Sequence, residues 1–143
     1  MCIRDRLLAE RGYLYSSSMK DCDWAYLWEK DQKELPLVEL PNDITMDDFT
    51  YYYFTFSDPA VRCMYPNREV FGNWKHEFDG LALEGNKIFI LKLHPQFVGR
   101  ASRVQMLSRL IGYRKSHGAW LDTNRAVASW VLKENGFQVP DHE

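Results

Sequence analysis

The sequence predicts an α/β fold built around a parallel sheet, and two observations support this prediction. Apolar runs that suit strands alternate with segments whose apolar residues recur at helical spacing, and the connections between them are short. The chain has 143 residues, of which 45% are hydrophobic and 15% aromatic, enough for one domain with its own core. Strand, helix, strand and helix in succession are typical of a parallel sheet whose crossover helices pack on its outer face.

The first third of the chain predicts a helix end followed by short strands. Residues 7–12 resemble the last turn of a helix that ends at Gly12, and residues 13–15 suit a strand. A further apolar strand spans residues 37–40 and stops at a proline. The aromatic run 49–56 has strong β-propensity but no polar alternation, so it predicts a strand that is buried on both faces or lines a cavity.

The middle of the chain predicts a long helix and the clearest strand of the sequence. Residues 67–83 carry apolar side chains at helical spacing, with Asn67 placed as the N-cap and Gly85 at the end. These apolar side chains are Val70, Phe71, Trp74, Phe78 and Leu81. Residues 88–93 form an almost continuous apolar run, which suits a buried parallel strand.

The last third predicts two more helices with a short strand between them. A helix over residues 102–115 presents one apolar stripe, and residues 119–121 suit a short strand. Thr123 is placed to cap the final helix, which ends at Gly136. The expected buried positions are Val104, Leu107, Leu110 and Ile111 in the first helix, and Val127, Trp130 and Val131 in the second.

Composition and charge argue against several classes of function. Eighteen Lys and Arg against twenty Asp and Glu give a net charge of −2, so we expect no nucleic-acid partner. No run of about 18–20 apolar residues predicts a membrane helix, and the charged start is unlike a signal peptide, so a cytoplasmic location is the default expectation. The three cysteines predict free thiols, and the four histidines show no spacing typical of metal ligands, so we expect no metal site within the chain.

His94 is the first residue after the clearest strand, and ligands of parallel α/β proteins bind beyond the carboxyl ends of strands. An imidazole there can exchange a proton near neutral pH, although it can also cap the sheet by bonding to backbone. Asp23 and Asp48 belong to acidic pairs that can orient an imidazole or bind a substrate hydroxyl, or can simply face water. Trp24 and Tyr26 can stack on sugar faces or belong to the core.

An ordered set of short motifs resembles the C-terminal part of a polysaccharide deacetylase of the NodB-homology superfamily. These motifs are GYLYSSSM at residues 12–19, Asp23, Tyr26, LVELP at 37–41, Asp47 with Asp48, and LHPQFVGR at 93–100 with Arg103. The resemblance is greatest to the branch that contains peptidoglycan-deacetylase-like and allantoinase-like proteins. It implies the C-terminal portion of a deformed (β/α) barrel over residues 7–137, preceded by a non-native leader at 1–6 and followed by a tail at 138–143.

The resemblance also implies a chemistry. In such proteins a divalent metal, usually zinc, is held by an Asp and two His near the start of the domain, and the segments that carry these ligands have no counterpart here. His94 is then the catalytic proton donor to the departing amine, and Asp23, Trp24, Tyr26 and Asp48 are expected to bind substrate. The implied reaction removes N-acetyl groups from a polysaccharide, and the present chain is expected to be an inactive truncated piece of the enzyme.

Two alternatives remain open at this point: an allantoinase-like hydrolase of cyclic amides or ureides, and a non-catalytic carbohydrate-binding remnant. Two departures from the family pattern bear on this choice. Ser16 stands where relatives carry an Asp, which removes one expected charge partner of His94, and Ile44 stands where many carry Trp. A half barrel also exposes a sheet edge, so an oligomer through that edge is expected.

Overall fold

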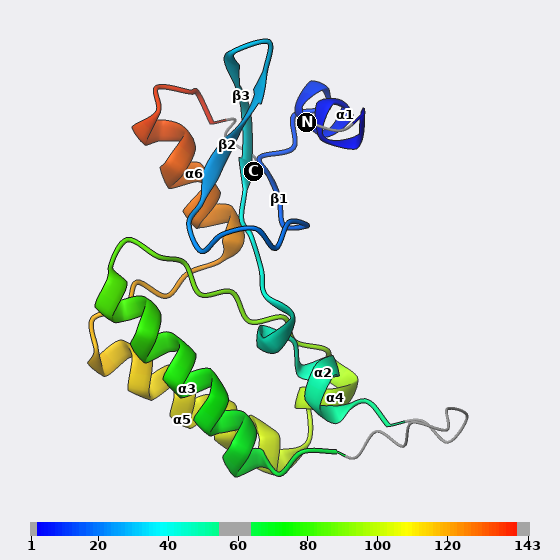
Figure 1. Ribbon diagram of the computed structural model, residues 1–143, viewed down its shortest axis with the longest axis vertical. Coiled ribbons are helices and arrows are strands. Elements are labelled where there is room, and N and C mark those ends of the chain that lie inside the picture. The colour runs from blue at the N-terminus through cyan, green and yellow to red at the C-terminus, as the bar shows by residue number, and fades with distance from the viewer. Residues whose placement is uncertain (1–2, 55–63, 140–143) are drawn as a thin grey trace. The chain divides into compact units, whose positions relative to one another are not determined.

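The structure, a computed structural model, describes residues 3–54 and 64–139 (Figure 1). The chain divides into two compact units, one formed by residues 1–42 with 122–143 and the other by residues 43–121. Strands and helices are both present, so the predicted α/β class is confirmed. No helix among the described residues is both long enough and apolar enough to cross a membrane.

The first unit is a three-stranded sheet with helices packed against it. Its elements are α1 (Ile3–Glu10), β1 (Tyr15–Ser16), β2 (Tyr26–Lys30), β3 (Lys33–Glu39) and α6 (Asn124–Glu134). The strand order is β1-β3-β2, with β1 parallel to β3 and β2 antiparallel to it. Helix α6 packs against β3 and β1 (Figure 1). Leu37 of β3 and Leu132 of α6 are fully or almost fully buried, so the core of this unit lies between these two elements.

The β2–β3 hairpin was not expected from the sequence. Its two-residue turn consists of Asp31 and Gln32, both with positive φ (52° and 62°). Two left-handed residues are what a tight turn needs to match the twist of its strands, but glycine or asparagine usually supplies them. Asp31 is common at the first position of such a turn, but Gln32 is not typical of the second, so the pair gives no clear hairpin signal.

The second unit is mainly helical, and α3 and α5 lie side by side in it (Figure 1). Its elements are the 3₁₀ turn η1 (Ile44–Met46), α2 (Asp48–Tyr52), α3 (Asn67–Glu84), α4 (Pro95–Val98) and α5 (Ala101–Ser116). One core cluster joins these helices: Met46, Tyr51, Tyr52, Val70, Trp74, Met106 and Leu110. Phe89, Leu91 and Leu93 pack against it from the extended segment that follows α3.

Three predicted strands are corrected by the structure. Residues 49–52 of the aromatic run belong to α2, because Asp47 caps a helix there by accepting a hydrogen bond from the Phe49 N–H. Residues 55–56 of the run lie outside the described residues. Residues 88–93 are extended, but within the described residues they make a single parallel bridge, Asp47 to Lys92. Residues 119–121 form no strand. A strand needs a hydrogen-bonded neighbour, which apolarity alone does not provide.

Other helix features are partly as expected. Gly12 and Gly136 have positive φ just after their helices, and Thr123 caps α6 by accepting the Ala126 N–H, so these three predictions are confirmed. Asn67 is not the N-cap of α3, since Pro66 occupies that position; Asn67 instead accepts a hydrogen bond from the Tyr52 hydroxyl.

The buried stripes of α5 and α6 are also rotated from the predicted ones. Met106, Leu110 and Arg114 are buried in α5, whereas Val104 and Ile111 are exposed. Trp130 of α6 is 54% exposed, contrary to the prediction.

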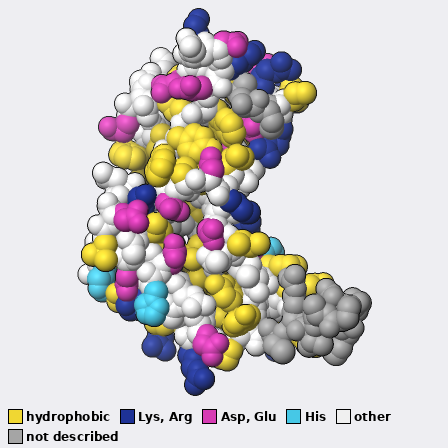
Figure 2. Space-filling view, in the orientation of Figure 1, with side chains coloured by type: hydrophobic (Ala, Val, Ile, Leu, Met, Phe, Trp, Pro, Cys, Tyr) yellow, Lys and Arg dark blue, Asp and Glu magenta, His cyan; other side chains and the backbone are white. Residues whose placement is uncertain are grey.

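Figure 2 shows hydrophobic side chains gathered on the visible face of the unit that carries α6 and β2. The large exposed apolar side chains of this unit include Ile3, Leu7, Tyr13, Trp24 and Trp130.

Candidate active site

Two successive aspartates at the start of α2 form the base of the candidate site. Asp47 is the N-cap of α2 and accepts the Phe49 N–H at 2.9 Å. Asp48 follows it as the first helical residue and is completely buried. The Asp48 N–H donates to the Lys92 carbonyl at 3.1 Å. This backbone bond brings the start of α2 beside the end of the extended segment, two residues before His94.

His94 forms two hydrogen bonds to the carboxylate of Asp48. Its ring Nδ1 lies 2.6 Å from Asp48 Oδ1, and its backbone N–H donates to Asp48 Oδ2 at 2.9 Å. An ionised carboxylate can only accept hydrogen bonds, so Nδ1 carries the proton in this pair. The second ring nitrogen, Nε2, is then the atom left to exchange a proton, and the side chain of His94 is 34% exposed. His94 thus lies two residues after an isolated bridge residue, Lys92, and not at the end of the predicted strand, and its ring is partly exposed to solvent.

Two aromatic rings lie beside the imidazole of His94. The ring centroids of Phe49 and Phe97 both lie 5.8 Å from that of His94, and 5.6 Å from each other. Tyr53 stacks on Phe49 at 4.4 Å. Phe49 is 38% exposed, so part of an apolar ring is presented to solvent beside the imidazole. Such a surface can contact the C–H face of a sugar or the methyl of an acyl group.

Asp47 adds a second carboxylate near the imidazole. Its Oδ1 lies 3.5 Å from His94 Nδ1, and its Oδ2 lies 3.4 Å from the ammonium of Lys92. The lysine partly neutralises this carboxylate, while Asp48 has no lysine or arginine within ion-pairing distance among the described residues. Asp48 is therefore the dominant partner of the ring.

Asp47, Asp48 and His94 are also close enough to be candidate ligands of one metal ion, since their ligand atoms all lie within 4.8 Å of one another. Two ligands of one tetrahedral zinc are ~3.3 Å apart, as follows from metal–ligand bonds of about 2.0–2.1 Å. The 2.6 Å between His94 Nδ1 and Asp48 Oδ1 is shorter than this and fits a hydrogen bond. Both oxygens of Asp48 already accept hydrogen bonds from His94. In this arrangement the three residues fit an oriented imidazole and do not fit a zinc site.

The other predicted substrate-binding residues lie in the first unit. Asp23 and Trp24 are exposed, and the Tyr26 hydroxyl donates to Asp21 at 3.0 Å. Burial and the neighbouring Asp21 carboxylate raise the pKa of Tyr26 above its ordinary value. The structure brings His94 and Asp48 together and does not test a role in substrate binding for Asp23, Trp24 and Tyr26.

The departure at Ser16 does not leave His94 without a carboxylate. Ser16 is buried in β1 and its hydroxyl donates to that of Ser18. The charge partner of His94 is Asp48, for which the sequence left open whether it orients an imidazole, binds a substrate hydroxyl or faces water. Ile44 is 58% exposed. Phe49 and Phe97 were also missed as neighbours of His94, because Phe49 was assigned to a strand.

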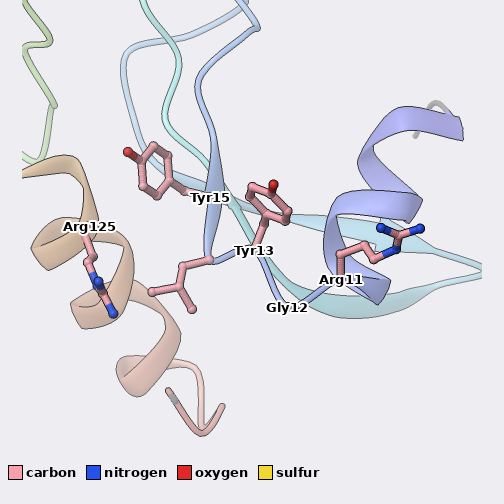
Figure 3. A pocket seen from close by; sticks show the side chains of 6 residues that line it. Arg11, Gly12, Tyr13, Tyr15 and Arg125 are labelled. Carbon is pink, nitrogen blue, oxygen red and sulfur yellow. The ribbon is translucent and has the colours of Figure 1, made fainter. Parts of the chain in front are cut away.

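A shallow cavity of about 480 Å³ lies in the first unit, around the turn between α1 and β1 (Figure 3). It is lined by Arg11, Gly12, Tyr13, Leu14, Tyr15 and Arg125. Figure 3 shows Arg125, on α6, and Arg11, just after α1, on opposite sides of β1, and the two side chains do not point toward one another. The cavity therefore lacks the converging polar groups that typify a ligand site.

No protein-family model and no curated protein matches the sequence. Solved structures do match its fold. A Mycobacterium smegmatis protein assigned as a polysaccharide deacetylase matches with a TM-score of 0.79 and 25% identity, over 96% of this chain and 48% of that one. A Pseudomonas aeruginosa PAO1 protein assigned as a polysaccharide deacetylase matches with a TM-score of 0.74 and 28% identity, over 93% of this chain and 44% of that one.

The structure titled Puue allantoinase also matches, with a TM-score of 0.74 and 24% identity, over 93% of this chain and 43% of that one, and it shows likeness of fold alone. The present chain thus spans less than half the length of these solved chains. The matches confirm the fold predicted from the sequence, that of part of a NodB-type barrel. The resemblance to the polysaccharide deacetylase, or NodB-homology, superfamily is confirmed with it.

Proposed function

We propose that this chain provides the proton-donating side of an amide hydrolase that removes N-acetyl groups from a polysaccharide. The observation that supports this most strongly is the pairing of the partly exposed His94 ring with the completely buried Asp48, with 2.6 Å between Nδ1 and Oδ1. The two solved structures assigned as polysaccharide deacetylases support the choice of reaction class.

The chemistry of the pair follows from its geometry. Expelling an amine from a tetrahedral intermediate requires a proton on the departing nitrogen, because the amide anion is a very poor leaving group. The protonated imidazole of His94 donates this proton from Nε2, while Nδ1–H stays bonded to Asp48. The buried carboxylate holds the ring in one tautomer and orientation, as a triad aspartate does for its histidine. A correctly placed acid of this kind typically contributes ~10²–10⁴-fold in rate.

The surroundings of the imidazole suit an acylated sugar. The partly exposed ring of Phe49 and the ring of Phe97 supply an apolar wall beside the proton donor. We assign this wall to the substrate's apolar face, and we also propose carbohydrate contacts for Asp23, Trp24 and Tyr26. A divalent metal, zinc being the expected one, would have to be held by residues other than Asp47, Asp48 and His94.

The proposal is tested by joining this chain to the half of the M. smegmatis protein that it does not match, and measuring acetate release from N-acetylglucosamine oligomers. His94→Ala should lower kcat by ~10²–10⁴-fold with little change in KM. Asp48→Asn should lower kcat while the protein remains folded. His76→Ala is the matched control, because His76 is an exposed histidine of α3 and is not part of the site. A His94→Ala enzyme with unchanged kcat would refute the assignment.

Two further measurements separate the alternatives. Nitrogen-15 NMR of the present chain should show the Nδ1-protonated tautomer of neutral His94, and the opposite tautomer would contradict the pairing with Asp48 independently of any activity. Allantoin is assayed beside the acetylated oligomers. Hydrolysis of allantoin alone would replace the deacetylase proposal with that of a ureide hydrolase, and binding of oligomers without hydrolysis would favour a carbohydrate-binding remnant.

A further inference from the structure

Arg103 belongs to the motif set that resembles the deacetylase family, and the proposed site gives it no role. It lies in the first turn of α5, and its side chain is half-buried. The guanidinium contacts two other helices, α2 and α4. These two short helices carry the candidate site, since Asp48 begins α2 and His94 is the N-cap of α4.

Arg103 binds the end of α4 that is opposite to His94. Its Nη1 donates a hydrogen bond to the Phe97 carbonyl at 2.7 Å. The N–H groups of Phe97 and Val98 both donate to the His94 carbonyl, at 2.8 and 2.9 Å, and so close the single turn of α4. Hydrogen bonds from a charged donor are shorter and stronger than those between neutral groups. The arginine thus fixes the turn that holds the backbone of His94 and the ring of Phe97.

Arg103 also contacts the end of α2 that is opposite to Asp48. Its guanidinium lies over the Tyr52 ring, 3.8 Å from the centroid, and its Nη2 lies 3.8 Å from the Met64 sulfur, a weak acceptor. Tyr52 is 2% exposed, and its hydroxyl donates to the side chain of Asn67 at the start of α3. A cation is attracted to the face of an aromatic ring, and more strongly when both are withdrawn from water. The buried ring therefore gives the guanidinium a fixed position on α2.

Helices as short as α2 and α4, with five and four residues, depend on contacts with other elements to keep their shape. At the site, the two helices are joined by the hydrogen bonds between Asp48 and His94 and by the contact of Phe49 with Phe97. Arg103 joins the same two helices at their other ends. A shift of about 1 Å between them would displace the imidazole from its carboxylate, and a misplacement of this size can lower a rate by ~10²-fold.

We propose that Arg103 is a positioning residue of the hydrolase, which holds α2 and α4 together so that Asp48 keeps His94 in one tautomer with Nε2 as the proton-donating atom. The proposal rests on the proposed function, because it assigns Arg103 a task in the chemistry of His94. Lysine replaces this arginine only in part. Its ammonium is a point charge, whereas the planar guanidinium lies over the Tyr52 ring and extends one nitrogen to the Phe97 carbonyl at the same time.

The first test needs no catalysis and uses nitrogen-15 NMR of the present chain. Neutral His94 should be in the Nδ1-protonated tautomer in the parent chain and in a mixture of both tautomers in Arg103→Met. Arg109→Met is the control for loss of an arginine, because Arg109 lies on the same helix over a ring of α3. Asp79→Asn is the control for loss of stability, because Asp79 joins α3 to α5. Both controls should keep the single tautomer.

The second test measures kinetics in the enzyme completed with the unmatched half of the M. smegmatis protein. Arg103→Met should lower kcat by ~10–100-fold with little change in KM. Arg103→Lys keeps the positive charge, so its kcat should lie between those of the parent and of Arg103→Met. If circular dichroism shows that Arg103→Met does not fold, Arg103→Lys decides the question, since it should still show a mixture of tautomers and a lowered kcat.

Three results would overturn the inference. A single Nδ1-protonated tautomer in the Arg103 variants would show that the arginine does not position the imidazole. A raised KM with an unchanged kcat would make Arg103 a direct contact of the substrate. Mixed tautomers in Asp79→Asn as well would reduce the effect to a general loss of stability. These results leave the assignment of His94 intact, whereas an unchanged kcat in His94→Ala refutes the proposed function and leaves the NMR result for Arg103 as it stands.

Discussion

Replacing Arg114 with methionine is expected to stabilise this chain. Arg114 lies in the last turn of α5 with its guanidinium enclosed between Phe78 and Phe89. Two of its nitrogens are buried without a hydrogen-bond partner. Methionine is similarly long and flexible and contacts aromatic rings favourably, so it can fill the same space without buried polar atoms.

The magnitude follows from the groups involved. A buried polar group without a partner costs ~1–3 kcal/mol, and Arg114 has Nε and Nη2 in this state. Stacking on Phe89 offsets ~2 kcal/mol of this, as for a desolvated cation over a ring. The two groups together cost ~2–6 kcal/mol, so after the stacking is subtracted the substitution should increase the free energy of unfolding by up to ~4 kcal/mol.

Desolvation also makes the effect depend on pH. Burial lowers the pKa of Arg114 from its ordinary value to about 10. The unfolded chain thus binds this proton more tightly than the folded chain does, so the charged guanidinium destabilises the fold at all pH values below about 10. Above that pH the folded chain loses the proton, and the penalty diminishes. The advantage of Arg114→Met should accordingly be constant near neutrality and decrease as the pH rises past about 10.

Urea unfolding followed by tryptophan fluorescence measures the difference in the free energy of unfolding between Arg114→Met and the parent chain. Arg109→Met is the matched control, because Arg109 lies on the same helix over Phe71 but is exposed. The control should change stability by less than ~0.5 kcal/mol. If Arg114→Met is less stable than the parent chain, the guanidinium has favourable interactions that outweigh its desolvation, and the reasoning is refuted.

Three further outcomes are expected. Lys75 lowers the pKa of Asp79 in α3, which also accepts a hydrogen bond from Tyr113 in α5. The ionised carboxylate should therefore contribute its full stabilisation above the ordinary pKa of Asp, and this contribution should be lost as the pH falls below that value. Asp79→Asn should flatten the acid branch of the curve of unfolding free energy against pH. Glu39→Ala should destabilise the chain by ~3 kcal/mol or more in urea unfolding, because the buried carboxylate accepts two backbone N–H groups and the Trp28 indole; Glu39→Gln, which retains one acceptor oxygen, should cost less. Exposed apolar side chains and an open sheet edge should make the chain self-associate, and a purely monomeric sedimentation profile at high concentration would contradict this.

The sequence by itself determined the features that depend on nearby residues. Gly12, Gly136 and Thr123 mark helix ends because a left-handed glycine and a capping hydroxyl act within one turn of chain. The long helix over residues 67–84 followed from its apolar spacing. The order of short motifs predicted the NodB-type fold, which the solved structures confirm.

Only the tertiary structure decided the partner of His94. Asp48 is 46 residues away in sequence, and its carboxylate meets the imidazole because a single parallel bridge joins Asp47 to Lys92. The same dependence on distant partners explains why residues 88–93 and 119–121 were wrongly predicted as strands: β-propensity describes a residue's fit to a sheet, and the sheet itself is made by other segments. Local sequence thus fixes helix ends and side-chain chemistry, whereas pairings over long sequence separations fix the site.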